Sequence, residues 1–379
     1  MKLSPEVERF RDELRRFAEK EIEPRSRWIE ENDAIPDDLM AKARELGLFG
    51  ITIPEEYGGV GLDLAGKCMV EEELGRSNYG FATVIANHTG ISTHPIVTLG
   101  SEALKRRYLP RMATGEWVGS FALTEPQAGS DPAAMRTTAV KKGDRYILNG
   151  EKIFITNAGI AQVFTVMAIT DKTKGIKGIS AFVVERGMPG FSIGKNELKM
   201  GMHGATTAPL AFTDCEVPAE NLLGAEGMGY IQALKTLTRG RVTIAARSCG
   251  IMDRLIERCV EYMKLRTQGG RKIAEYQGLQ WMLADMAVQR DASRALTERA
   301  IEALMRGERA TMEASVAKLY STEALGKVAD AAVQIHGGMG YMREAGIESY
   351  YRDVRIVRIY EGSSEIQRNI IAGALLRNE

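Results

Sequence analysis

One carboxylate in the sequence lies where chemistry is easiest to place. Glu361 stands in the segment RIYEGSSEIQR, residues 358–368, between two stretches of helical character. Gly362 lets the chain break a helix at low conformational cost, and Ser364 followed by Gln367 is typical of a capping box that starts the next helix. We therefore expect the carboxylate on a short, rigid break, which suits a general base.

The neighbours of Glu361 indicate how such a base would be tuned. Ile359 and Tyr360 flank it and would exclude water from the carboxylate. Desolvation disfavours the charged form, so the pKa of Glu361 is expected to rise toward the working pH. The alternative interpretation is an exposed glutamate at the end of a helix.

The composition argues against several classes of site. Lys plus Arg and Asp plus Glu both number 50, so the basic excess of a nucleic-acid-binding protein is missing. The 4 cysteines contain no C-x-x-C pair, and the 4 histidines stand in no metal-binding spacing. We expect no nucleic-acid partner, no disulfide framework and no metal site.

Size and location can also be inferred. A chain of 379 residues is long enough for two or three domains. The N-terminus MKLSPEVERFRDELRRF is rich in acids and has no apolar core of a signal peptide. No apolar run approaches the length of a membrane span, so we expect a cytoplasmic protein.

The periodicity predicts helices, then strands, then helices again. Apolar residues recur every three or four positions at the start of the chain, Gly47 is a plausible helix end, and Ser101 is a plausible helix start. From Trp117, β-rich runs alternate with turn signals, and Asn149-Gly150 is typical of a hairpin turn. Helical periodicity returns in four long segments, residues 227–266, 274–305, 311–336 and 363–376.

The expected fold is therefore mostly α with a central β domain. An N-terminal α-helical domain would cover residues 1–116 and a middle β-barrel or sandwich residues 117–226, followed by a C-terminal four-helix bundle over residues 227–379. Two glycine runs, GAEGMG (224–229) and HGGMG (336–340), follow no strand of a βαβ unit, which argues against a Rossmann fingerprint.

Five stretches together resemble the acyl-CoA dehydrogenase family, in its short-chain or butyryl-like subgroup. In chain order they are FALTEPQAGSD (121–131), FITN (154–157), LRTQGGRKIAEYQ (265–277), QIHGGMGY (334–341) and YRDVRIVRIYEGSSEIQR (351–368). The resemblance covers nearly the whole chain and implies the same three-part fold. It also implies FAD as cofactor and the α,β-dehydrogenation of an acyl-CoA thioester. Glu361 occupies the position of the base that removes the α proton, while hydride passes to the flavin N5.

The resemblance assigns the FAD contacts to several segments. Phe121, Leu123 and Thr124 would line the isoalloxazine edge, with Gly129 and Ser130 near the flavin and the thioester. Phe154 and Thr156 stand where the family commonly shows Trp and Thr, so Phe154 is a departure that keeps an aromatic face. The remaining cofactor-binding residues implied are Arg266, Gln277, Gln334, Gly337, Gly338, Ser363, Ser364 and Glu365.

Arg266 and Gln277 resemble a pair that reaches the FAD of a neighbouring subunit, which implies a homotetramer built as a dimer of dimers. The usual aromatic residue of that loop is replaced by residues 268–270, Gln-Gly-Gly. An electron-transferring flavoprotein is implied as redox partner by the resemblance alone.

The resemblance also implies a substrate pocket for a short, branched or cyclic acyl group. Gly240 stands where some relatives carry the base, which leaves Glu361 to serve, and Ala82 stands roughly where glutaryl enzymes carry an arginine. Thr238 stands where members of the family often have an acidic residue. His88 and Thr89 either face the ligand with Asn87 or pack against the β domain. The substrate-binding residues implied are Ser130, Thr238, Arg241, Gly362, Asn87 and Tyr360.

Other functions remain open at this point. A flavin-dependent enoyl-CoA reductase would use the same residues in reverse. An acyl-CoA oxidase would usually be longer by a further C-terminal domain. A catalytically silent helical scaffold would be expected to lose the base or the FAD loop, and Glu361, Thr124, Ser130 and Arg266 are present.

Overall fold

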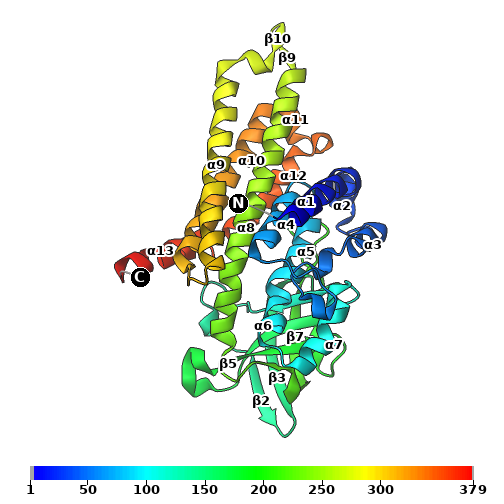
Figure 1. Ribbon diagram of the computed structural model, residues 1–379, viewed down its shortest axis with the longest axis vertical. Coiled ribbons are helices and arrows are strands. Elements are labelled where there is room, and N and C mark those ends of the chain that lie inside the picture. Colours follow the sequence, from blue (N-terminus) through cyan, green and yellow to red (C-terminus); the bar gives the residue numbers. More distant parts are fainter. Residues whose placement is uncertain (1–3, 378–379) are drawn as a thin grey trace.

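The computed structural model describes residues 4–377, which form a helical region, a β region and a second helical region in chain order; Figure 1 shows the strands at one end of the molecule and the two helical regions side by side. The N-terminal helices are α1 (Pro5–Phe17), α2 (Ser26–Asn32), α3 (Asp37–Glu45), α4 (Leu64–Gly75), α5 (Tyr79–Asn87), α6 (His94–Leu99) and α7 (Glu102–Ala113). Ser101 caps α7 by accepting a hydrogen bond from the Leu104 amide, and Gly47 adopts a left-handed conformation just after α3, both as predicted.

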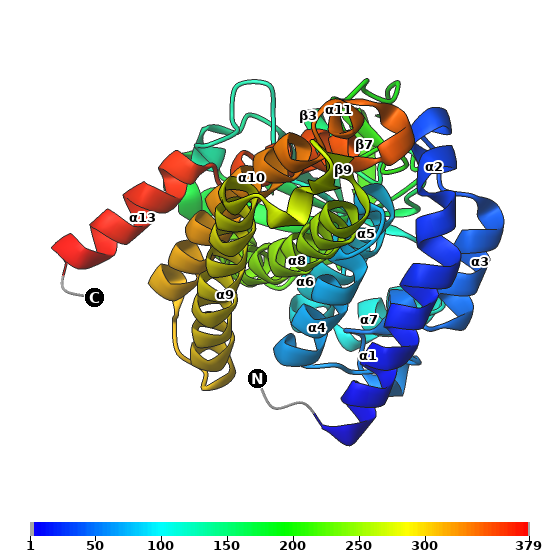
Figure 2. The same cartoon turned by 90° about the horizontal axis from the view of Figure 1, so that it is seen from above.

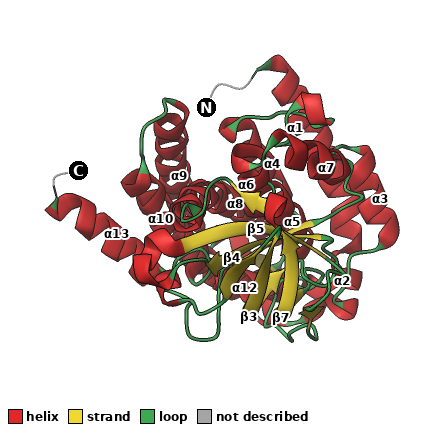
Figure 3. Ribbon diagram, turned by 90° about the horizontal axis from the view of Figure 1, so that it is seen from below, coloured by secondary structure: helices red, strands yellow, loops and turns green. Residues whose placement is uncertain are grey.

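The middle of the chain forms one eight-stranded sheet. Its strands are β1 (Gly119–Ala122), β2 (Thr138–Lys142), β3 (Arg145–Thr156), β4 (Val163–Ile169), β5 (Ile179–Glu185), β6 (Phe191–Ile193), β7 (Thr207–Pro218) and β8 (Leu222–Leu223). They lie in the order β6-β7-β3-β2-β4-β5-β8, with β1 paired in parallel to β4. Figure 3 shows the sheet from below, with helices beyond it.

Both faces of the sheet are covered, which explains why its central strand β4 is apolar except for Thr165. In β4, Phe164 and Val166 belong to one core cluster, whereas Val163 and Met167 belong to another that includes α7. Successive side chains of a strand point to opposite faces, so a strand buried on both sides shows no polar alternation.

The predicted hairpin turn at Asn149-Gly150 is wrong. Both residues lie inside β3, where the register with β7 shifts between Leu148 and Gly150. The turn falls instead between Lys142 and Arg145, which pair across β2 and β3. Gly150 has a φ of 146°, and a Cβ atom there would lie 2.5 Å from Thr137 Oγ1, so the glycine that resembled a turn signal allows a close approach inside the sheet, opposite an extra residue in β7.

The C-terminal part is dominated by three long helices. Its elements are α8 (Gly229–Leu265), the strands β9 (Thr267–Gln268) and β10 (Arg271–Lys272), then α9 (Gln277–Met305), α10 (Thr311–His336), α11 (Gly338–Tyr341), α12 (Ile347–Asp353) and α13 (Ser364–Leu376). Figure 2 shows α13 extending away from the other helices. The four predicted helical segments correspond to α8, α9, α10 and α13.

The two helical regions share one apolar core. Leu14 of α1 and Val70 of α4 belong to the same buried cluster as Leu255 of α8 and Leu325 of α10. This shared core fixes α4 and α5 against α8, so side chains from distant parts of the sequence meet between them. Within residues 4–377, no helix combines the length and apolar character that crossing a membrane requires.

Candidate active site

Glu361 lies in the irregular segment between a short 3-10 helix, Val354–Arg358, and α13. Its φ is 50°, and that of Gly362 is 92°. A left-handed conformation is costly for a residue with a side chain and persists only where the surroundings impose it. Lys318 of α10 and Gln367 of α13 each donate a hydrogen bond of 2.8 Å to the Gly362 carbonyl. These contacts stabilise the strained turn.

The predicted cap of α13 is wrong by one residue. Ser363, rather than Ser364, precedes the helix, and its hydroxyl accepts a hydrogen bond of 3.4 Å from the Ile366 amide. The left-handed pair before it leaves Ser363 extended, as an N-cap residue must be. Ser364 lies inside the helix and donates to Glu323 Oε1 at 2.6 Å. The side chain of Gln367 contacts the turn carbonyls instead of closing a capping box.

The carboxylate of Glu361 is arranged as a base would need. Its Oε2 atom is buried and has no hydrogen-bond partner among residues 4–377. Burial raises the pKa of Glu361 to about 7, while the positive charges of Arg247, Lys318 and Arg241 oppose that rise. A carboxylate with a near-neutral pKa can accept a proton at physiological pH.

The predicted contribution of Ile359 to this desolvation is wrong. Ile359 is 51% exposed and does not cover the carboxylate. Part of the cover comes from α8, because a Cβ atom placed on Gly240 would lie 2.1 Å from Glu361 Oε2. The Glu361 carboxylate therefore lies directly over a position that has no side chain.

Two further residues of α8, Arg241 and Thr238, differ in whether their polar groups are free to bind a ligand. Arg241 is buried, and its Nε has no hydrogen-bond partner among the described residues. Burial lowers its pKa, whereas the charge of Glu361 raises it. Thr238 donates its hydroxyl proton to the Leu234 carbonyl at 2.9 Å, so this proton is used within the helix.

The polar residues at the end of α5 mainly contact protein groups. His88 accepts a hydrogen bond of 2.8 Å from the Gly119 amide, so it packs against the β region. Burial lowers the pKa of His88 to about 4, which keeps it neutral. Thr89 donates to the Ile85 carbonyl at 2.7 Å, and Asn87 accepts from Ser92 at 2.9 Å.

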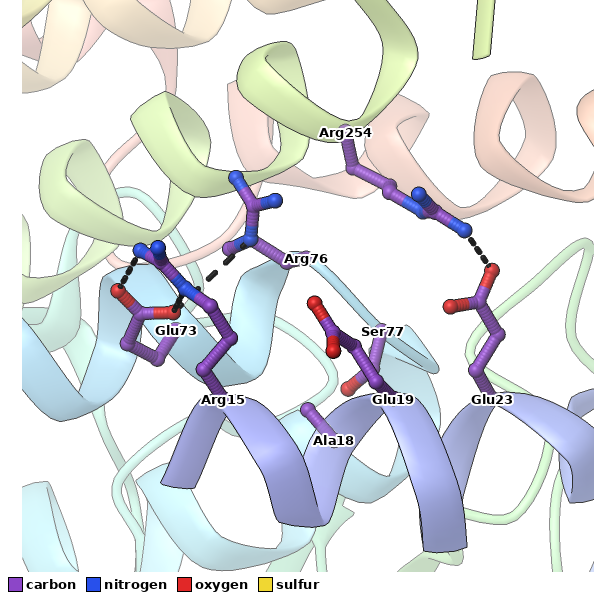
Figure 4. A pocket seen from close by; sticks show the side chains of 8 residues that line it. All are labelled: Arg15, Ala18, Glu19, Glu23, Glu73, Arg76, Ser77 and Arg254. Atoms are coloured by element: carbon purple, nitrogen blue, oxygen red, sulfur yellow. Dashed lines mark hydrogen bonds and ion pairs between the residues drawn. The ribbon is translucent and has the colours of Figure 1, made fainter. Parts of the chain in front are cut away.

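Two hollows elsewhere carry no comparable chemistry. Figure 4 shows the first, which is lined by Arg15, Ala18, Glu19, Glu23, Glu73, Arg76, Ser77 and Arg254. Its volume of about 10 Å³ has room for at most a water molecule, and ion pairs such as Arg15–Glu73 at 2.6 Å cross it. A second groove, of about 590 Å³, lies between α1, the start of α4 and the end of α9, away from Glu361.

The comparisons with known proteins agree with this arrangement. Models of the N-terminal, middle and C-terminal domains of acyl-CoA dehydrogenases match residues 4–116, 120–215 and 227–376. A short-chain specific acyl-CoA dehydrogenase of Clostridium acetobutylicum is 42% identical over 99% of both chains. The chain belongs to the acyl-CoA dehydrogenase family. Members are FAD-dependent oxidoreductases that dehydrogenate acyl-CoA thioesters.

Solved structures support the family membership over the full length. Butyryl-CoA dehydrogenase from Megasphaera elsdenii has a TM-score of 0.96 and 38% identity, and the match covers 100% of both chains. A chain in a structure titled for the electron transferring flavoprotein of Acidaminococcus fermentans also has a TM-score of 0.96, at 43% identity, and covers 100% of this chain and 99% of that one.

The segment predicted to line the flavin, residues 121–124, is held in place by a buried lysine of β3. Lys152 Nζ donates to Glu125 Oε1 at 2.7 Å and to the Leu123 carbonyl at 3.1 Å. Burial alone would raise the pKa of Glu125, but the Lys152 charge and amide donors hold it down to about 2. This buried ion pair was not predicted from the sequence. The available signal was a lysine, Lys152, at a buried position of a predicted strand, where a charged side chain needs a partner.

The surface in front of that segment fits a large planar cofactor. Phe154 is 63% exposed and has a φ of 57°, at a β-bulge between Lys152 and Ile155. An exposed aromatic ring on a strained backbone needs an explanation, and a ring that stacks on it supplies one. A Cβ atom on Gly129 would meet no atom within 4 Å. The residues present therefore fit FAD. Phe121 and Leu123 are buried, Thr124 and Thr156 are half-buried, and Ser130 is exposed.

Two of the other proposed FAD contacts, Arg266 and Gln277, lie at the far end of the molecule. Arg266 and Gln277 flank β9 and β10, at the opposite end of the bundle from β2 and β3 in Figure 1. Both residues are exposed, as are Gln334, Gly337, Gly338 and Glu365. A single chain does not bring Arg266 together with Phe154.

Proposed function

We propose that the protein dehydrogenates a short, branched or cyclic acyl-CoA at its α and β carbons, with Glu361 as the base. The observation that carries this proposal is the buried, unpaired Oε2 of Glu361 together with a pKa of about 7. A glutamate with only a structural role would be paired or exposed, because an unpaired buried carboxylate costs free energy.

In the proposed reaction, the α C–H bond breaks and its proton passes to Glu361 Oε2, while the electron pair forms the C=C bond as the β hydrogen leaves. FAD, when bound, supplies the acceptor for that hydrogen and its electron pair. Arg247, Lys318 and Arg241 limit the rise in the pKa of Glu361, so a substantial fraction stays ionised near neutral pH. Gly240 leaves the room that this carboxylate occupies.

The proposed substrate contacts are Ser130, Asn87, Thr238, Tyr360, Arg241 and Gly362. Asn87 retains a side-chain amide that no hydrogen bond among the described residues uses as donor. Arg241 supplies an unpaired Nε beside the base. Thr238 offers its hydroxyl oxygen only as an acceptor.

We further propose a cytoplasmic homotetramer of three-domain subunits, divided at residues 1–116, 117–226 and 227–379, in which Arg266 and Gln277 complete the FAD site of a neighbour. Large apolar side chains are exposed in the C-terminal part of the chain, and burial against a second copy of the protein would remove them from water. They include Leu265, Trp281, Val288, Tyr341, Leu375 and Leu376. The electron-transferring flavoprotein is proposed as electron acceptor because a structure titled for that protein contains a chain of this fold.

The first test is the visible spectrum of the purified protein, followed by anaerobic titration with butyryl-, isobutyryl-, glutaryl- and cyclohexanecarboxyl-CoA. A yellow protein that one thioester bleaches supports the dehydrogenation and identifies the acyl class. If no saturated thioester bleaches the flavin but an enoyl-CoA restores the yellow colour of the chemically reduced protein, the result would support the reductase direction. A protein that stays colourless after reconstitution with FAD would contradict the proposal.

Glu361→Gln is the matched test of the base. The amide cannot accept the α proton, so the variant should retain FAD and bind acyl-CoA without bleaching. Near-normal flavin reduction by this variant would remove Glu361 from the mechanism.

A further inference from the structure

Three buried charged side chains lie between α4 and α8, near the base. Lys67, Glu71 and Arg247 have side chains only 5%, 1% and 5% exposed. Lys67 Nζ lies 2.5 Å from Glu71 Oε1, and Arg247 Nε donates to Glu71 Oε2 at 2.7 Å. Apolar residues of similar volume would stabilise such a position at least as well. The cluster therefore calls for a reason other than stability.

Contacts lead from this cluster to the base. The Arg247 guanidinium lies over the Tyr79 ring, 5.5 Å from its centroid. The Tyr79 hydroxyl is 2.7 Å from the Tyr360 hydroxyl, and Tyr360 directly precedes Glu361. Arg247 thus stands at the start of a chain of contacts that ends at the residue before the base.

The strained turn at Glu361 needs support on both sides. Lys318 and Gln367 fix the carbonyl of Gly362, on the C-terminal side. On the N-terminal side, the side chain of Tyr360 is fixed by Tyr79, which in turn packs under Arg247. A residue with φ of 50° keeps its geometry only while such contacts persist.

We propose that Arg247 is a positioning residue for Glu361: fixed by Glu71 and Lys67, it orients Tyr360 through Tyr79 and keeps the base carboxylate in place. This inference rests on the proposed role of Glu361 as the base. The cluster adds a second effect, because its charges act on the same carboxylate.

Charged and titratable groups from every side face Glu361. They are Arg241 and Arg247 of α8, Lys318 of α10, Glu71 of α4 and the adjacent Tyr360. Among the cations, Arg247 lowers the pKa of Glu361 most, whereas Glu71 raises it. Removing Arg247 should therefore raise this pKa above about 7, and removing the charge of Glu71 should lower it. A loosened structure alone would not shift the pKa in opposite directions.

The test measures flavin reduction in the holoenzyme by stopped flow with butyryl-CoA, across pH. We expect Arg247→Gln to move the midpoint of the rate profile up by about one pH unit, and Glu71→Gln to move it down. Tyr79→Phe keeps every charge, so it should leave the midpoint in place and lower the plateau rate by roughly tenfold through a misplaced base.

Arg254→Gln is the matched control, because Arg254 lies on the same helix but pairs with Glu23 and does not reach the base. It should leave the midpoint unchanged. If Arg247→Gln does not fold or does not retain FAD, Arg247→Lys keeps the charge and loses the fork to Glu71, so its plateau rate should fall as in Tyr79→Phe. Unchanged profiles in the Arg247 and Glu71 variants, or shifts in the same direction, would overturn the proposal.

A second readout separates this proposal from the proposed function. The carboxyl infrared band of Glu361, identified by its loss in Glu361→Gln, titrates in the holoenzyme without turnover. Opposite shifts of this band in the Arg247 and Glu71 variants would support the coupling even if no acyl-CoA bleached the flavin. An unshifted band would refute the coupling even if wild-type catalysis were confirmed.

Discussion

Gly240→Ala tests the geometry of the base most directly. The added Cβ atom would lie 2.1 Å from Glu361 Oε2, so the carboxylate must move by about 1.3 Å to reach an ordinary contact of 3.4 Å. A displacement of about 1 Å can cost roughly 100-fold in rate. The variant should nevertheless fold well, because Ala stabilises a helix interior by about 1 kcal/mol relative to Gly.

The assay compares stopped-flow flavin reduction with the thermal midpoint and the FAD content of the same preparations. Gly373→Ala is the matched control, since its Cβ would be 3.5 Å from the nearest atom, Arg377 Nη2, and α13 gains the same helix propensity. A reduction rate of Gly240→Ala within about twofold of wild type, with a normal thermal midpoint, would refute the contact between Gly240 and Glu361.

Four further variants or conditions follow from the same structure. The flavin reduction rate of the wild type should rise about tenfold per pH unit below the Glu361 pKa of about 7 and level off above it, because the ionised carboxylate is the active form; a flat profile between pH 5 and 7 would contradict this. Glu361 and Asp353 both have pKa values raised to about 7 in the folded protein, so their protonated forms contribute stability at low pH that is lost as the pH rises toward 7. Asp353→Asn removes one of these groups, and the thermal midpoint of the variant should therefore decline less than that of the wild type between roughly pH 4 and 7. Lys152→Met removes the cation that is paired with the buried Glu125 and should destabilise the fold by about 3–5 kcal/mol, as measured by denaturant unfolding, whereas an unchanged midpoint would show that the pair is dispensable. Arg266→Ala should reduce the FAD retained on gel filtration, and full retention would count against the cross-subunit contact.

Local patterns in the sequence were sufficient for the order of the elements. The helix period over residues 311–336 and the Ser101 cap depend on neighbours within one or two turns, so they can be read from the chain. The break that carries Glu361 is also local, since Gly362 and the start of α13 define it. The predicted turn at Asn149-Gly150 was wrong because a glycine with positive φ can stand inside a strand as well as in a hairpin turn, and only the pairing with β7 distinguishes the two.

Tertiary structure decided what surrounds the base. Gly240 is 121 positions from Glu361 in the sequence, yet it defines where the carboxylate lies. Glu71 and Arg247 are 176 residues apart and meet only because α4 packs on α8. The sequence by itself determined which residues can accept a proton and that the chain breaks between helices at Glu361. Burial and charge at Glu361 depend on contacts between distant helices, because desolvation and electrostatic interactions act through space rather than along the chain.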